Sequence, residues 1–230
     1  MKFIVNALFL LIGLQLCHAQ IDSLNLADSR YKEDQFYFGI TYNLLGNKPS
    51  KVKQSRFSTG IHLGFIKDMP INIKRNIAIG AGLGYSFNTF NQNLLINRDA
   101  SGSLVYGILA DNNAYKKNIL SSHSIELPIE FRWRTSSPTE YKFWRIYTGI
   151  KAGYAFSSSG KHQGDLGSLK IYQNEDFNKL QYGLTLSAGY DTWNFHLYYA
   201  LNPIFSNNAQ ISGNPIDMNA IKVGLMFYVL

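Results

Sequence analysis

The sequence predicts an all-β protein: an eight-stranded antiparallel transmembrane β-barrel with up-and-down topology, preceded by an N-terminal signal peptide. Apolar and polar residues alternate with a period of two over most of the chain, the connections between these segments are alternately short and long, and the first residues form an export signal. A lipid-facing apolar surface around a polar interior requires that alternation, because neighbouring side chains of a strand point to opposite faces.

The first twenty residues have the pattern of a secretory signal. Lys2 supplies a positive start, residues 3–16 are mostly apolar, and Ala19 is the small residue that a signal peptidase needs, so cleavage is expected before Gln20. A retained membrane helix is the less favoured alternative, since the stretch is shorter than the roughly 20 residues of a span. The only cysteine, Cys17, lies in the signal, which excludes disulfides and thiol catalysis from the predicted mature chain. The expected division is signal peptide 1–19, periplasmic N-terminal segment 20–34 and barrel 35–230.

Composition agrees with this fold class. Aromatic residues make up 14% of the chain and charged residues 16%, and a mean hydropathy of −0.12 is what averaging an apolar face with a polar face gives. The net charge of +7, less that of Lys2, leaves +6. No basic helix or base-stacking motif accompanies this charge, so we expect no nucleic acid. Outer-membrane lipid and lipopolysaccharide are the expected acidic partners. Lys48, Lys51, Lys53 and Arg56 are candidates to contact their headgroups, unless they simply form a solvated loop.

Eight segments carry the alternation, and several have the roughly 9–11 residues that a tilted membrane strand needs. In the third segment, Ile77, Ile79 and Leu83 share one face while Gly80 and Gly84 lie on the other. The segments are 35–44, 56–67, 75–88, 122–134, 142–156, 179–190, 193–202 and 219–230.

The connections predict the orientation. Those after the second, fourth and sixth segments are short, at 68–74, 135–141 and 191–192. The other connections, 45–55, 89–121, 157–178 and 203–218, are long. Outer-membrane barrels have short periplasmic turns and longer external loops, so both termini are expected in the periplasm.

Aromatic residues predict two belts at the membrane interfaces. Trp133, Trp144, Trp193 and Tyr190 gather at the rim with short turns, as an aromatic girdle would. A second group lies at the opposite rim: Tyr42, Phe57, Phe87, Tyr154 and Phe156. A soluble lipocalin-like barrel is the alternative, but its interior would have to hold side chains as bulky as Trp133 and Phe131.

The hairpin of residues 122–156 predicts a charge network in the lumen. An eight-stranded barrel has an interior that side chains fill, and buried charges need partners. The expected members are Glu126, Glu130, Arg132, Arg134, Arg145 and Lys151, with His62 and His196 as possible neighbours. Face parity and the short turn favour a register that puts Glu126 opposite Lys151, Glu130 opposite Tyr147 and Arg132 opposite Arg145. A charge-selective pore or a proton path is the functional alternative.

Signals for chemistry are weak. Ser158, Ser159, His162 and Asp165 share a Gly-rich loop, but polar external loops contain such residues routinely and nothing fixes a catalytic geometry. His62 and His196 lack metal-ligand spacing. We therefore predict no enzyme, no cofactor and no metal. The long loop 89–121, which is partly apolar and could extend its strands as a hairpin, is the best candidate for a partner-binding surface.

One part of the chain resembles a known family. The runs Ile125-Glu-Leu-Pro-Ile-Glu-Phe-Arg-Trp-Arg-Thr135 and Tyr141-Lys-Phe-Trp-Arg-Ile-Tyr-Thr-Gly149 are similar to a hairpin of the PorT/SprT-type outer-membrane β-barrel proteins of Bacteroidota. The resemblance implies an accessory or assembly role in the type IX secretion system, linked in some relatives to gliding motility, with proteins of the secretion machinery as partners. It brings no catalytic residues. A small-solute porin-like channel and a surface adhesin that uses the external loops remain alternatives.

Overall fold

The computed structural model describes residues 32–110, 114–136 and 142–229. The predicted signal peptide and residues 20–31 lie outside this part of the chain. Within it, no helix is long and apolar enough to cross a membrane.

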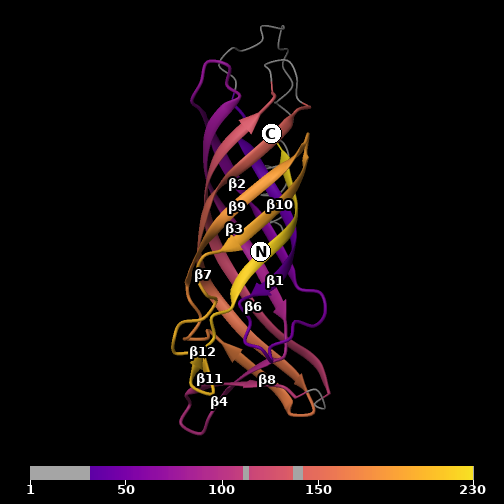
Figure 1. Ribbon diagram of the computed structural model, residues 1–230, viewed down its shortest axis with the longest axis vertical. Helices are drawn as coiled ribbons and strands as arrows, with labels where there is room; N and C mark the ends of the chain where they lie inside the picture. The colour runs from indigo at the N-terminus through magenta and orange to yellow at the C-terminus, as the bar shows by residue number, and fades with distance from the viewer. Residues whose placement is uncertain (1–31, 111–113, 137–141, 230) are drawn as a thin grey trace, which may run out of the picture.

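Eight strands form one closed antiparallel barrel, as the sequence predicts (Figure 1). Each strand pairs with its neighbours in chain order, and the barrel closes where the first of them pairs with the last. The strands are β1 (Gln35–Gly46), β2 (Thr59–Pro70), β3 (Ile77–Asn91), β6 (Tyr115–Arg134), β7 (Trp144–Gly164), β9 (Leu180–Tyr190), β10 (Trp193–Ala200) and β13 (Asn219–Val229).

The two faces of the wall differ as the alternation predicts. On β1, Phe36, Phe38 and Ile40 are exposed on the outside, whereas Thr41 and Asn43 are buried inside. The same outward apolar and inward polar pattern recurs around the barrel. Apolar side chains on the outside of a closed barrel suit contact with lipid rather than water.

The barrel has two unlike ends. The short-turn end is the one at which β2 is followed by β3, β6 by β7 and β9 by β10, through the connections 71–76, 135–143 and 191–192. At the opposite, long-loop end, β6 and β7 continue past the other strands, and β8 (Gly167–Tyr172) returns along β7. Much of what the sequence predicts as loop 157–178 is therefore strand.

Glycines on β3 make room for large side chains that cross the lumen. A Cβ atom on Gly84 would overlap the Tyr37 hydroxyl, and one on Gly80 would lie 2.8 Å from Arg132 Nε. Tyr37 and Arg132 are both buried. The space that the glycines leave open is thus occupied by side chains from β1 and β6.

An apolar plug closes the lumen at the long-loop end. Inward residues of six barrel strands join apolar residues of the loops in one buried cluster. We call this cluster the plug; its members include Phe90, Leu94, Ile96, Leu120, Phe177, Tyr198, Ile204, Phe205, Ile216 and Met218. Contributions from six of the eight barrel strands place it across the lumen.

The long loop 89–121 supplies part of the plug. β3 and β6 lengthen at its two ends, as the sequence predicts, but the middle forms a separate hairpin of β4 (Leu94–Arg98) and β5 (Leu104–Ile108). Its apolar residues Leu94 and Ile96 are buried in the plug, so they are not available to a partner. A second small hairpin, β11 (Gln210–Ile211) with β12 (Asn214–Pro215), lies at the same end (Figure 1).

Candidate functional site

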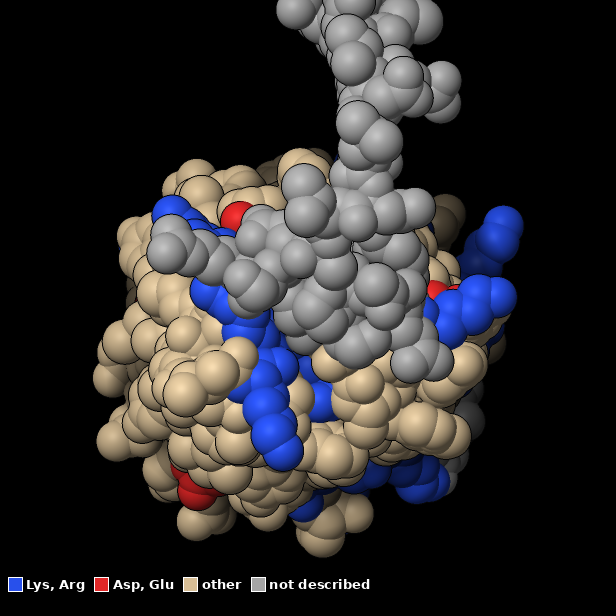
Figure 2. Space-filling model, turned by 90° about the horizontal axis from the view of Figure 1, so that it is seen from above, with Lys and Arg blue, Asp and Glu red and all other residues tan. Residues whose placement is uncertain are grey.

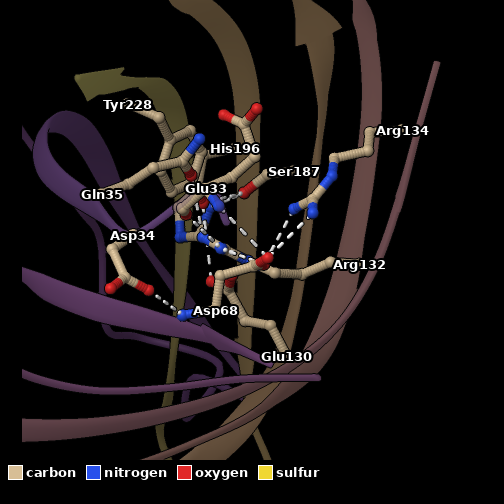
Figure 3. A network of polar contacts seen from close by, with 10 residues as sticks. All are labelled: Glu33, Asp34, Gln35, Asp68, Glu130, Arg132, Arg134, Ser187, His196 and Tyr228. Carbon is tan, nitrogen blue, oxygen red and sulfur yellow. Dashed lines mark hydrogen bonds and ion pairs between the residues drawn. The ribbon is translucent and has the colours of Figure 1, made fainter. Parts of the chain in front are cut away.

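A buried ion-pair network lies at the short-turn end (Figure 3). Asp68 is fully buried and binds two arginines. Arg132 Nη1 donates to its Oδ1 at 3.0 Å, Arg134 Nη1 donates to Oδ1 at 2.8 Å and Arg134 Nη2 donates to Oδ2 at 2.8 Å. Fork-shaped contacts of this kind combine charge attraction with fixed geometry.

Arg132 also bonds other groups that approach from several strands. Its Nε lies 3.2 Å from Glu130 Oε2, its Nη2 donates to Gln35 Oε1 at 2.9 Å and its Nη1 donates to the Glu33 carbonyl at 3.2 Å. The guanidinium carbon lies 4.4 Å from the centroid of the Tyr147 ring. Arg132 therefore ties β6 to β1, β2 and β7 across the interior. We call Glu33, Gln35, Asp68, Glu130, Arg132 and Arg134 the short-turn network.

A second charged group occupies the middle of the lumen. Glu126 accepts from Lys151 Nζ at 3.1 Å, lies 3.5 Å from His62 Nδ1 and lies 3.9 Å from Lys222 Nζ. All four side chains are buried. One carboxylate thus faces two ammonium groups, and we call this set the mid-lumen cluster.

Across the described residues, the buried ionisable side chains nearly balance. Apart from the histidines, four acids face five bases: Glu33, Asp68, Glu126 and Glu130 with Arg132, Arg134, Arg145, Lys151 and Lys222. Buried charges are costly unless paired, and replacing one partner leaves the other stranded. This near balance indicates that the charges fill and stabilise the lumen.

The predicted register of the β6–β7 hairpin is wrong by two residues. Glu126 lies opposite Gly153, Glu130 opposite Gly149 and Arg132 opposite Tyr147. Face parity permits either register. The prediction assumed a shorter turn than the one observed, in which a backbone hydrogen bond still joins Thr135 to Trp144. The Glu126–Lys151 ion pair nevertheless forms, because a long lysine side chain reaches its diagonal neighbour across the strands.

The other predicted network residues have different surroundings. Arg145 is buried, with its guanidinium carbon 4.5 Å from the Phe143 ring centroid, and two of its nitrogens have no hydrogen-bond partner within the described chain. The sequence prediction missed Asp68 by placing it in the turn 68–74. Ile66 and Asp68 lie an even number of positions after His62, so they share its inward face of the strand. This pattern could have identified Asp68 from the sequence.

A serine and a histidine meet in the lumen without forming a usable catalytic site. Ser187 Oγ lies 2.7 Å from His196 Nδ1 and 3.2 Å from the Tyr228 hydroxyl. Both Ser187 and His196 are buried, and the adjoining cavity measures about 10 Å³. That volume admits about one water molecule, so no substrate reaches the serine.

A second cavity in the lumen is also too small for a solute. The cavity beside the mid-lumen cluster, which Lys151 and Lys222 help to line, has a volume of about 30 Å³. Such a space holds roughly two waters, given about 10–15 Å³ for each. These two lumen cavities can hold water but are too small for a solute.

The predicted aromatic girdle residues lie on the outer surface at the short-turn end. Trp144 and Trp193 both lie opposite Tyr190, and their neighbour Trp133 follows on β6. The Trp144 and Tyr190 ring centroids are 5.4 Å apart. All four residues lie on the successive strands β6, β7, β9 and β10. Phe36 and other aromatic rings lie at the same height on the opposite side of the barrel. Figure 2 looks onto this end and shows Lys and Arg outnumbering Asp and Glu on the visible face.

Ser158, Ser159, His162 and Asp165, which the sequence places in one segment without a catalytic geometry, each have separate surroundings. Ser158 accepts from the Asn174 amide, Ser159 bonds Ser121, and the Asp165 carboxylate accepts from the Ala114 amide. His162 is buried, and its two ring nitrogens have no hydrogen-bond partner in the described residues. Nor do those residues contain a group of three or more His, Cys, Asp or Glu that could hold a metal ion.

An ion pair fastens the β4–β5 hairpin to the β8–β9 connection. Arg98 Nη2 donates to Glu175 Oε1 at 2.8 Å, and the Tyr106 hydroxyl donates to Asp176 Oδ2 at 2.9 Å. The hydrogen bond from Arg98, aided by its charge, holds the pKa of the Glu175 carboxyl below its ordinary value. The hairpin that carries part of the plug is thereby fixed at its outer edge.

A closed eight-stranded barrel with an apolar exterior, a charged interior and an aromatic girdle defines a transmembrane barrel of the outer-membrane type. Residues 18–206 match the family described as the outer membrane protein beta-barrel domain, and the chain belongs to that family. It is accordingly a protein of the outer membrane.

Two further comparisons provide less information about the protein. Comparison with curated proteins finds no match. Among solved structures, the chain is similar to Ail, the attachment invasion locus protein of Yersinia pestis, with 10% sequence identity and a TM-score of 0.37 over 86% of this chain and 99% of that one. A likeness of this degree carries no functional argument.

Proposed function

We propose that this protein is a non-conducting outer-membrane barrel that acts as an accessory or assembly component of protein secretion. The observation that carries the proposal is the closed lumen: the plug fills one end, and the mid-lumen cluster and short-turn network fill the rest. A barrel closed in this way acts through its surface, by contact with other proteins.

The closed lumen argues against the small-solute channel. Opening a path would require removal of the Asp68 contacts with both arginines, and breaking a buried ion pair costs on the order of 3–5 kcal/mol. It would also require displacement of plug side chains such as Phe177 and Phe205, each costly to expose. Thermal fluctuation alone will rarely meet both costs together.

The secretion assignment rests on the resemblance of the β6–β7 hairpin to PorT/SprT-type barrels, which points to the type IX system and, in some relatives, to gliding motility. A surface suited to a protein partner adjoins the same strands. β6, β7 and β8 form a sheet that extends past the barrel wall, and β8 pairs only with β7 among the described strands. An unpaired strand edge can accept a strand from a partner.

We further propose that the short-turn end, with both termini, lies in the periplasm and the long-loop end faces outward. The connection lengths support this orientation. The projecting sheet of β6, β7 and β8 would then lie outside the cell.

Deletion of the gene, followed by measurement of the secreted proteins, tests the secretion role. We expect secreted cargo to fall and to recover when the wild-type chain is restored. A second strain receives a variant in which a two-residue Asn-Gly turn replaces residues 161–170. If the β8 edge binds the partner, this variant should fail to restore export, provided that it still folds in the membrane. Normal export in the deletion strain would refute the role.

The projecting sheet also favours a second candidate, a surface adhesin. Cells carrying the wild-type chain would then adhere to host or surface material more than the deletion strain does, and the same hairpin replacement would abolish the difference. Equal adhesion of the two strains would exclude this candidate.

A further inference from the structure

A lateral notch opens in the barrel wall at the long-loop end, between β7 and the connection from β8 to β9. Below the notch, Tyr154 pairs with Leu180 and the Ala155 amide donates to the Lys179 carbonyl at 2.7 Å. Above it, the Gln173 amide donates to the Ser158 carbonyl at 2.7 Å. Between these contacts the connection leaves the wall, and a cavity of about 460 Å³ remains. That volume is in the range of ligand sites and far exceeds the lumen cavities.

The outer wall of the notch is aromatic. Tyr154, Phe156 and Tyr172 line it and are 52%, 50% and 65% exposed. The centroid of the Phe156 ring lies 6.4 Å from that of Tyr85 and 6.2 Å from that of the His123 ring, both on nearby strands. The notch therefore opens sideways at the level of the second aromatic belt, where membrane headgroups lie.

The floor of the notch carries an unused hydrogen-bond donor. Asn174 is 2% exposed, and its Oδ1 accepts from the Asp176 amide at 2.8 Å and lies 3.2 Å from the Tyr106 hydroxyl, which donates its proton to Asp176. Its Nδ2 has no partner among the described residues. A buried donor without an acceptor is unfavourable, so this amide is suited to an acceptor that enters the notch. Phe177, buried behind it, separates the notch from the lumen.

The mouth of the notch carries an uncompensated positive charge. Lys179 is exposed and has no ion pair with any residue that the structure describes. The one carboxylate in the lining, Glu175, is already bound by Arg98 at 2.8 Å. The free charge in the notch is thus that of an ammonium group, which favours an anionic ligand.

We propose that the notch binds the anionic sugar headgroup of a membrane glycolipid. A phosphate or carboxylate on the sugar pairs with Lys179, a sugar oxygen accepts from Asn174 Nδ2, and the C–H face of the ring lies against an exposed aromatic side chain. The sideways opening at the belt favours a lipid over a free sugar. The proposed orientation of the barrel is needed for one part of this proposal, the assignment of the glycolipid to the outer leaflet.

Native mass spectrometry of the full mature chain in neutral detergent tests the site. The probe is lipid A, an acylated and bisphosphorylated glucosamine disaccharide, titrated against the wild type and two variants. Lys179→Gln removes the charge, and Asn174→Asp keeps the accepting oxygen while replacing the donor by a carboxylate. Each variant should weaken lipid A binding about tenfold, as loss of one charge-assisted hydrogen bond does. Lys170→Gln, a change of the same kind on β8, should leave binding unaltered.

Controls on the ligand separate the sources of the headgroup. Phosphatidylglycerol, which is anionic but lacks the sugar, should bind the wild type more weakly than lipid A does, and soluble glucosamine 6-phosphate should not compete. Unchanged lipid A binding in both notch variants would overturn the proposal, as would an equal loss in Lys170→Gln. Competition by the soluble sugar would overturn the choice of a lipid. A strain that exports normally without the gene would refute the secretion role but leave these binding results unchanged.

Discussion

The short-turn network predicts a large effect from a single isosteric change, Asp68→Asn. The carboxylate accepts three side-chain hydrogen bonds of 2.8–3.0 Å from Arg132 and Arg134, and all three side chains are fully buried. Asparagine keeps one accepting oxygen, removes the charge and turns an NH₂ group toward donors. Removing one partner of a buried ion pair costs on the order of 3–5 kcal/mol. Because Arg132 keeps Glu130 and Gln35, we expect the lower end, about 3 kcal/mol.

Urea unfolding of the barrel in lipid vesicles, followed by tryptophan fluorescence, measures this effect. Asp191→Asn is a matched control, since it removes the same charge at the same end from a partly exposed turn residue. The control should stay within about 0.5 kcal/mol of the wild type. If Asp68→Asn unfolds at the same urea concentration as the control, the network does not stabilise the barrel and the reasoning fails.

Three further predictions follow from other contacts. Glu126→Gln leaves two buried ammonium groups without a carboxylate, so the free energy of unfolding should fall by about 3 kcal/mol in the same assay; an unchanged value would show that the mid-lumen cluster is solvated. Gly84→Ala should cost about 1–3 kcal/mol by overpacking against the Tyr37 hydroxyl, and adding Tyr37→Phe should recover part of the loss, whereas no recovery would refute that contact. Arg98 lowers the pKa of Glu175 below 4.5, so the stabilisation from this pair is present above the ordinary pKa and is lost as the pH falls through the lowered value. In an NMR titration, Arg98→Gln should raise the Glu175 midpoint, and equal midpoints would exclude the pairing.

The sequence predicts the faces of the strands well because a strand has a strict period of two. The outward Ile77 and Leu83 and the inward Lys222 and Tyr228 are placed correctly by parity alone. Parity cannot distinguish two registers that differ by two residues, however. The β6–β7 error arose there, because the register depends on the geometry of the turn.

The plug and the notch could not be predicted from the same pattern. Phe177 and Phe205 belong to connections without a period, and they meet only because the barrel brings their ends together. The donor of Asn174 is left unpaired by the path of a loop, which sequence spacing does not reveal. Asp68, in contrast, continues the inward parity of its strand, and a longer second strand would have included it in the predicted network.

Planar-bilayer recording of the purified protein tests the closed lumen most directly. With the plug across one end and Asp68 bound to both arginines at the other, we predict no steady single-channel conductance over a wide voltage range. A variant that lacks residues 92–109, the part of the plug that β4 and β5 supply, and also carries Asp68→Ala, Arg132→Ala and Arg134→Ala weakens both closures. It serves as a positive control and should show brief openings. Steady, resolvable conductance from the wild-type protein would contradict the account.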